Sequence, residues 1–171
     1  MDTKATKKLG NNWMVRSSDN GTAYGGFQWQ PIGEWTTAPD WDPTPECGNG
    51  LHGQGPGGWG YSQGGSRFEL VQTKGKRISI DSNKIKVKSA KIIAVDLEAW
   101  QMVITLTSGN FPGAVDLREY THPLPEGLTS IGEYVDLEGY THPLPEGLTS
   151  IGGYVYLRGY THPLPEGLVK K

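Results

Sequence analysis

The sequence predicts a mainly β protein in which a small β domain, rich in Trp and Gly, continues into a parallel β-solenoid of four coils. Three observations support this fold class: a 20-residue unit recurs toward the C-terminus, Trp and Gly gather in the first half, and the two halves carry opposite charge. Residues 1–91 hold 12 Lys and Arg against 8 Asp and Glu, or +4, whereas residues 92–171 hold 4 against 10, or −6. We therefore expect a boundary near residue 92, between a domain of residues 1–91 and a repeat region of residues 92–171.

The repeat is almost exact. Residues 121–140 and 141–160 differ at only three positions, and a third copy begins at Thr161. A fixed period of this length is typical of stacked coils. The tripeptide Val-Asp-Leu recurs every 20 residues from Val95, and becomes Val-Tyr-Leu in the last copy. We expect four stacked strands, near residues 93–98, 113–118, 133–138 and 153–158, with a degenerate first unit that caps the array.

Each unit divides into an alternating segment, Gly-x-Tyr-Val-x-Leu-x-Gly-Tyr, and a returning segment with two prolines. The alternation indicates a short strand, and Pro123 and Pro125 exclude a regular helix from the return. The unit resembles the leucine-rich repeat family, in its short bacterial class of 20 residues with a Leu-Pro element, over about residues 93–168. It departs from that family where the family usually places Asn, at Tyr120, Tyr140 and Tyr160.

Stacking would place equivalent residues of adjacent coils roughly 4.8 Å apart, so that each repeat position becomes a row. The outward positions of the strands form rows of acidic, basic and tyrosine side chains, a mixture that suits protein docking. The expected binding surface consists of Asp116, Arg118, Tyr134, Asp136, Glu138, Tyr154, Tyr156 and Arg158.

Two further rows contain side chains of types that bind metal ions. One contains His122, His142 and His162, and the other contains Asp96, Asp116 and Asp136. Imidazoles and carboxylates both bind metal ions, but copied sequence explains the first row and pairing with Arg118 explains the second. We therefore predict no metal and no cofactor.

The N-terminal half contains five of the six Trp residues among many Gly and Pro residues, a composition typical of turns wrapped around aromatic anchors. Alternation predicts strands at residues 13–16, 23–29, 67–73, 77–80 and 84–87, and a sixth, at 91–97, that leads into the repeats. No helix is predicted.

The most specific string outside the repeats is Cys47-Gly-Asn-Gly-Leu-His52. Together with Gly-Phe at residues 26–27 and an Arg-Phe strand from Arg67, it resembles a poorly characterised domain of phage and prophage proteins that carries a Cys-x-x-Gly-[Phe/Leu]-His motif. The resemblance covers about residues 12–97. It implies a phage or mobile-element origin, and hence the host cytoplasm, but no particular chemistry.

His52 is the one candidate catalytic residue, because acidic side chains and Cys47 flank it in the sequence. Its position also resembles that in ADP-ribosyl transferases, whose fold places short His-containing strands at a nucleotide cleft. A histidine on such a turn more often bonds loop backbone, so enzymatic activity is uncertain and a non-enzymatic role is favoured. A possible nucleotide-like ligand would meet His52, Trp59, Lys84, Lys86 and Lys88. Alternatively, the lysines prevent pairing of an exposed strand with other chains.

Composition narrows the functional classes. The net charge of −2 and the acidic repeats make nucleic acid an unlikely partner, and a single cysteine excludes an internal disulfide. No apolar run approaches the roughly 20 residues of a membrane span, so we expect a cytoplasmic protein. The first expectation is a binding protein that recognises a host protein through the repeat strands. The alternatives are binding, sequestration or transfer of a nucleotide-like molecule, and self-assembly into a homo-oligomer.

Overall fold

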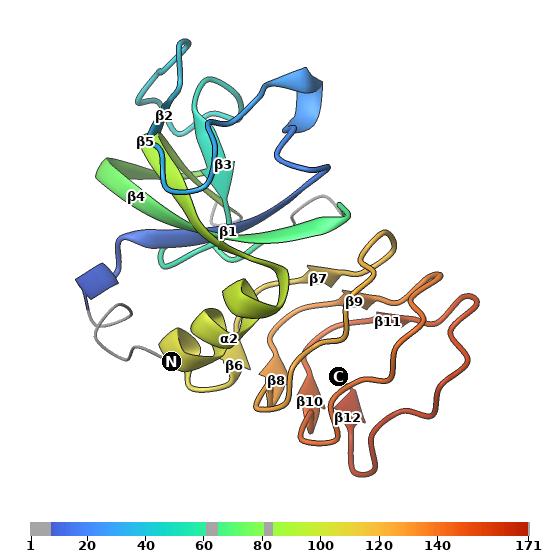
Figure 1. Cartoon of the computed structure of the whole chain (residues 1–171). Helices are drawn as coiled ribbons and strands as arrows, with labels where there is room; N and C mark the ends of the chain where they lie inside the picture. The colour runs from blue at the N-terminus through green and yellow to red at the C-terminus, as the bar shows by residue number, and fades with distance from the viewer. Residues whose placement is uncertain (1–7, 61–64, 81–83, 171) are drawn as a thin grey trace.

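The computed structural model describes residues 8–60, 65–80 and 84–170. The chain is mainly β (Figure 1). The N-terminal part is an antiparallel sheet in the order β1-β4-β5-β2, with β3 also paired to β5. The strands are β1 (Trp13–Ser18), β2 (Thr36–Thr37), β3 (Leu51–Gly53), β4 (Arg67–Ile80) and β5 (Lys84–Val95). An antiparallel bridge between Val15 and Gln54 links the end of β3 back to β1, so the backbone pairing closes into a ring.

Strands β4 and β5 form one long hairpin rather than several short strands. The strands predicted at 67–73 and 77–80 are two halves of β4, separated by a register shift between Lys74 and Arg77. Gly75, with φ 84°, lies in this shift and interrupts the alternation that the prediction relied on. The strands predicted at 84–87 and 91–97 likewise merge into β5, which ends at Val95.

The predicted strand at 13–16 is confirmed as the start of β1, but the one at 23–29 is wrong. That segment contains a 3-10 turn, η1 (Tyr24–Gly26), in which Gly25 and Gly26 have φ values of 77° and 82°. Consecutive residues with positive φ cannot continue a strand, and only a single bridge, between Thr22 and Gln28, remains of the expected pairing. Strands β2 and β3 were not predicted, because each is only two or three residues long.

The first repeat unit is helical from residue 96 on, which corrects the absence of predicted helices. Of the strand predicted at 93–98, only residues 93–95 are extended, as the end of β5. Helix α2 (Asp96–Thr107) begins where β5 ends and buries Ala99, Trp100 and Val103. This unit lacks the two prolines that keep the later units extended, and acidic side chains in its first turn favour a helix N-terminus. The helix ends at Thr107, and the next residue, Ser108, has a left-handed conformation in which its N–H donates to the carbonyl of Ile104.

Residues 108–170, the repeat array, form two parallel sheets (Figure 1). One sheet has the order β12-β10-β8-β6 and the other β11-β9-β7. Partners lie 20 residues apart from β6 to β11, as in the pairs Phe111 with Ile131 and Val115 with Val135, so the register predicted from the repeat is confirmed there. The last pairing differs, because Ser150 of β10 lies opposite Val169 of β12, only 19 residues away. The second sheet, through the returning segments, was not predicted. The strands are β6 (Asn110–Phe111), β7 (Val115–Asp116), β8 (Ser130–Ile131), β9 (Val135–Asp136), β10 (Ser150–Ile151), β11 (Val155–Tyr156) and β12 (Val169–Lys170).

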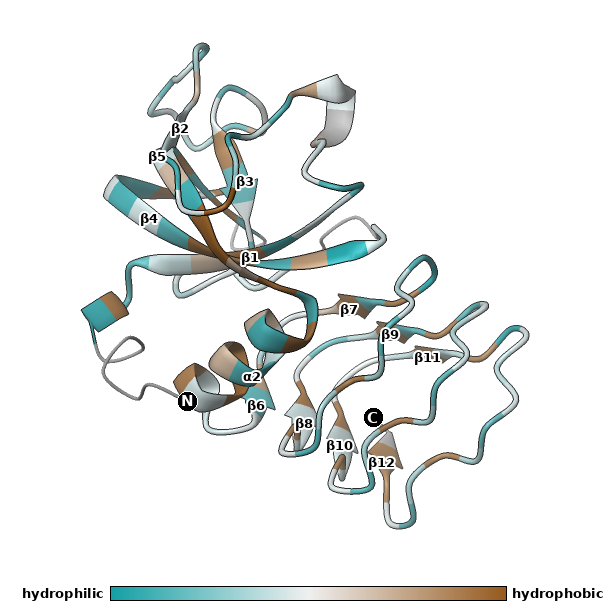
Figure 2. Cartoon of the chain, viewed as in Figure 1, coloured by the Kyte–Doolittle hydropathy of each residue, from teal (hydrophilic) through white to brown (hydrophobic). Residues whose placement is uncertain are grey.

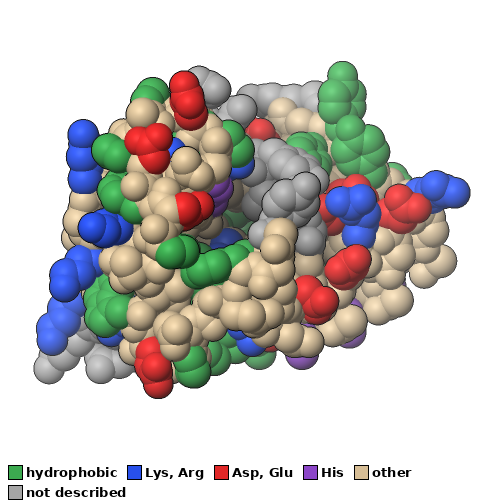
Figure 3. All heavy atoms as spheres, turned by 90° about the horizontal axis from the view of Figure 1, so that it is seen from above, with side chains coloured by type: hydrophobic (Ala, Val, Ile, Leu, Met, Phe, Trp, Pro, Cys, Tyr) green, Lys and Arg blue, Asp and Glu red, His purple; other side chains and the backbone are tan. Residues whose placement is uncertain are grey.

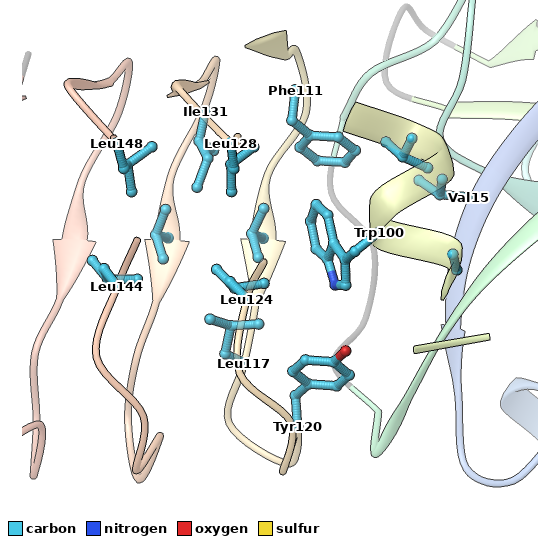
Figure 4. Packing of buried hydrophobic residues seen from close by; sticks show 14 of the residues in the cluster. Val15, Trp100, Phe111, Leu117, Tyr120, Leu124, Leu128, Ile131, Leu144 and Leu148 are labelled. Carbon is cyan, nitrogen blue, oxygen red and sulfur yellow. The ribbon is translucent and has the colours of Figure 1, made fainter. Parts of the chain in front are cut away.

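The largest hydrophobic core runs without interruption from the N-terminal sheet through α2 into the repeats. Figure 4 shows Trp100 and Phe111 between the helix and the first coil, with Leu128 and Leu148 further along the inside of the array. Figure 2 shows the same continuity as hydrophobic stretches along β5 and α2. Because one core serves both halves, α2 acts as the cap that the first coil requires.

Tyrosine hydroxyls connect adjacent coils. The hydroxyl of Tyr140 donates to the carbonyl of His122 at 3.0 Å and accepts the N–H of Leu124 at 3.0 Å. The hydroxyl of Tyr160 accepts the N–H of Leu144 in the same way, at 3.1 Å. These bonds satisfy backbone groups of the returning segment that no strand pairs, and they explain the Tyr at the end of the repeats that close with Tyr140 and Tyr160.

Glycines permit the close stacking of the coils. A Cβ atom at Gly132 would collide with the carbonyl of Pro112, and one at Gly152 would collide with the carbonyl of Gly132. Side chains at these positions would push adjacent coils apart.

No helix in the described part of the chain is both long and apolar enough to cross a lipid bilayer.

Candidate functional site

A cleft of about 760 Å³ lies on the side of the N-terminal sheet that faces away from α2. Its lining combines residues 47–53 with residues from β1, from the segments before and after β2 and from the start of β5. The side chains relevant to its chemistry are Arg16, Phe27, Trp29, Asp40, Cys47, His52 and Lys84.

The loop of residues 47–50 gives the cleft one of its walls. Three consecutive residues have positive φ: Gly48 at 96°, Asn49 at 51° and Gly50 at 146°. Gly50 also packs against Trp41, whose ring would lie 3.2 Å from an added Cβ atom. This tight turn places Cys47 and His52, which are five residues apart, on the lining of the same cleft.

The ring of His52 is held by its own loop. Its Nε2 donates to the carbonyl of Gly48 at 3.3 Å, which leaves Nδ1 as the acceptor of the neutral imidazole. Burial lowers the pKa of His52, and the positive charge of Lys84 lowers it further. His52 is therefore a neutral hydrogen-bonding group at physiological pH.

Cys47 and Lys84 lie together on the cleft lining. A hydrogen bond from Lys84 lowers the pKa of the Cys47 thiol, although partial burial opposes the shift. Cys47 is exposed and unbonded to any other cysteine.

The remaining predicted ligand residues lie elsewhere. Lys86 is almost fully buried, and its ammonium donates to the carbonyls of Glu46 at 2.8 Å and Gly48 at 3.0 Å, so it supports the loop rather than facing the cleft. Lys88 is exposed on β5 outside the cleft lining. Trp59 packs in the main core, with its ring 5.4 Å from that of Phe111, and joins the two halves of the molecule.

Arg16 is the residue that sequence analysis missed. It is 6% exposed, and its Nε pairs with Glu69 at 3.2 Å. Glu69 is fully buried and also accepts hydrogen bonds from Ser18 at 2.6 Å and from Arg67 at 2.5 Å. The only signal in the sequence is that Arg16 falls in the inward alternation of a buried strand, where a charged residue needs partners.

The predicted docking surface is a second candidate site. Its strand residues are in register, with Asp116, Asp136 and Tyr156 side by side. Arg118 pairs with Asp116 at 2.5 Å and with Asp136 at 3.4 Å, so it bridges the two carboxylates. Arg158 lies 3.4 Å from Glu138. These ion pairs are exposed on at least one side and contribute little to stability.

The tyrosines of this surface cluster at the last coil. Tyr154 is 77% and Tyr156 51% exposed, and the adjacent Leu157 is 39% exposed. The rings of Tyr134 and Tyr156 meet edge to face with centroids 6.0 Å apart. Seen from above in Figure 3, acidic and basic side chains lie beside hydrophobic ones over the repeat array.

Two of the three histidines of the histidine row bond backbone carbonyls, and the aspartate row is shorter than predicted. His142 and His162 bond the carbonyls of Thr121 and Thr141 in the preceding coil, at 2.8 and 2.6 Å. Asp96 is not in the aspartate row, because it opens α2 and accepts the N–H of Phe68 at 3.1 Å. Among the described residues, no group of three or more His, Cys, Asp or Glu side chains is arranged to hold a metal ion.

Comparison of the chain with protein-family models, with curated proteins and with solved structures gives no match.

Proposed function

We propose that this chain is a non-enzymatic binding protein that takes a nucleotide-like small molecule in the cleft of its N-terminal sheet. The observation that carries this proposal is the convergence of His52 and Lys84 on a cleft of about 760 Å³. Ligand pockets commonly measure about 300–1,000 Å³ and combine apolar walls with a few convergent polar groups. Phe27 and Trp29 supply apolar wall here.

The state of His52 favours binding over catalysis. Its Nε2 is engaged by a loop carbonyl, and its pKa is lowered, so it can accept a hydrogen bond from a ligand hydroxyl or N–H group through Nδ1. Lys84 offers a positive charge to an acidic part of the ligand. Sugar hydroxyls and phosphate groups together are characteristic of nucleotides.

Native mass spectrometry of the protein, purified gently from a bacterial lysate, tests this proposal. We expect a small-molecule adduct on the wild-type chain that is lost when His52 and Lys84 are both replaced by Ala. The variant Lys76→Ala, which removes an exposed lysine of β4 outside the cleft, should keep the adduct. An adduct retained by the double variant would contradict binding in this cleft.

A second candidate function is recognition of a protein by the repeat strands, as a host protein if the chain is phage-encoded. It is favoured by the exposed cluster of Tyr154, Tyr156 and Leu157, because solvent-exposed aromatic residues beside charges are typical of protein interfaces. This proposal treats the repeat array as a parallel β-solenoid, whose stacked coils present one continuous face.

The double variant Tyr156→Ala, Arg158→Ala tests the second candidate. Partner capture from lysate should be lost while the melting temperature stays within a few degrees, because both side chains are exposed. Glu146→Ala, on an exposed turn of the array, is the control. Unchanged capture of the same partner by the double variant would rule out this surface.

A further inference from the structure

We propose that the floor of the cleft is an oxyanion site in which Arg16 is the principal donor. This inference rests on the proposed function, since the oxyanion would be part of the ligand that enters the same cleft. The ligand would therefore contain an oxyanion group, and Arg16, which lies outside the Cys47–His52 motif, would bind it.

The pleat of β1 directs Arg16 toward the cleft. Trp13 and Val15 belong to the core shared with α2 and the repeats, whereas Met14 belongs to the smaller core around Trp29. Because successive side chains of a strand point to opposite faces, Arg16 lies on the Met14 side, and it lines the cleft.

The guanidinium is held from two directions. Its Nε pairs with Glu69 at 3.2 Å, and its central carbon lies 4.2 Å from the ring centroid of Trp29. These two contacts fix the plane of the group. An arginine held in this way loses little further freedom when it binds a ligand.

The charges beneath the cleft do not balance. Two guanidinium groups, Arg16 and Arg67, share the single carboxylate of Glu69, so the cluster carries one excess positive charge. Burial lowers the pKa of Arg16, and Glu69 offsets only part of that effect. Lys84 adds another positive charge to the lining and Asp40 one negative charge.

The terminal nitrogens of Arg16 have no partner in the part of the chain that the structure describes. Neither Nη1 nor Nη2 makes a hydrogen bond to a described residue, although both are almost completely buried. A buried charged donor without a partner is costly, whereas a guanidinium fork matches the two oxygens of a carboxylate or phosphate. An oxyanion at the cleft floor would satisfy these donors and neutralise the excess charge.

Binding measurements by calorimetry with four probes test the proposal: adenosine 5′-monophosphate, adenosine, inorganic phosphate and succinate. We expect the nucleotide to bind the wild-type protein at least tenfold more tightly than adenosine does. Binding of phosphate alone would identify a phosphoryl group as the oxyanion, and binding of succinate alone would identify a carboxylate. Either result supports the site.

The variant Arg16→Lys keeps a positive charge beside Glu69 but removes the fork, so it should weaken nucleotide binding at least tenfold. Arg77→Lys, at a partly exposed position of β4, is the matched control and should bind like the wild type. The melting temperature of each variant establishes that it is folded. Trp29→Leu is the second variant if Arg16→Lys does not fold, because it releases the guanidinium without removing it.

The outcomes separate the two proposals. If the nucleotide binds wild type and Arg16→Lys with equal affinity, the oxyanion site is wrong but ligand binding in the cleft stands. The same conclusion follows if adenosine binds as tightly as the nucleotide. If none of the four probes binds the wild-type protein, both proposals are wrong.

Discussion

The guanidinium of Arg16 lies over the indole ring of Trp29, 4.2 Å from its centroid. The contact joins β1 to the loop that follows η1. A desolvated cation above an aromatic ring is stabilised by about 2 kcal/mol. The same contact orients the terminal nitrogens of Arg16, so the packing of this loop and the chemistry of the cleft floor depend on each other.

Replacement of Trp29 by Leu should lower the free energy of unfolding by about 2–4 kcal/mol, because the ring is 8% exposed and its removal leaves a void beside Arg16. The free energy of unfolding is measured by chemical denaturation. Trp35→Leu is the matched control, since Trp35 is 41% exposed, and should cost less than about 0.5 kcal/mol. An equal loss of unfolding free energy in the two variants would contradict the burial of Trp29 relative to Trp35.

Removal of one hydroxyl should distinguish Tyr140 from Tyr120. Tyr140→Phe leaves the N–H of Leu124 and the carbonyl of His122 without their partner and should destabilise the protein by about 1–2 kcal/mol. The hydroxyl of Tyr120 is buried without a hydrogen bond among the described residues, because the backbone that would bond it belongs to α2. Tyr120→Phe should therefore be neutral or stabilising, and denaturation midpoints compare the two. A larger loss for Tyr120→Phe would contradict this account.

The same tyrosines predict an alkaline transition. Burial raises the pKa of Tyr140 from 10.0 to about 12. Because the folded state holds this proton more tightly than the unfolded state, the stabilisation is complete below pH 10 and disappears as the pH rises from 10 to 12. Unfolding experiments between pH 9 and 12 should show a steeper loss of stability for wild type than for Tyr140→Phe. If stability falls with pH equally in the two proteins, the hydroxyl of Tyr140 does not contribute to the alkaline transition.

Deletion of residues 141–160 should leave a folded protein. The deletion joins Tyr140 to Thr161, which repeats the natural junction of Tyr140 with Thr141, and the remaining strands keep their register. We expect an unchanged sign and shape of the circular dichroism spectrum and a lower melting temperature, because one layer of the core is lost. Loss of the folded state would indicate that the coils do not stack as independent layers.

The repeat itself made the register of the array predictable, since identical residues every 20 positions can pair in only one way without exposing Leu128 and Leu148. The helical cap was not predictable from the same pattern. Val95-Asp96-Leu97 copies the strand tripeptide, but the missing prolines and the alternative partner Phe68 turn Asp96 into the start of α2.

The candidate site was predicted in part. The Cys47–His52 motif and Lys84 identified one wall of the cleft, because turn-forming glycines and alternating lysines are visible in a sequence. Trp59 was predicted to meet the ligand but packs in the main core, because the sequence does not show which core an aromatic side chain joins. Arg16 was missed because its role depends on Glu69 and Trp29, which lie 53 and 13 residues away in the sequence.

The central claim is that the cleft binds a nucleotide-like ligand, and a titration of isotope-labelled protein with adenosine 5′-monophosphate, followed by amide NMR shifts, tests it most directly. The account predicts saturable shifts at Arg16, at residues 47–53 and at Lys84, with the amides of the repeat array unchanged. Shifts confined to the repeat array, or no saturable shift at any of these amides, would contradict it.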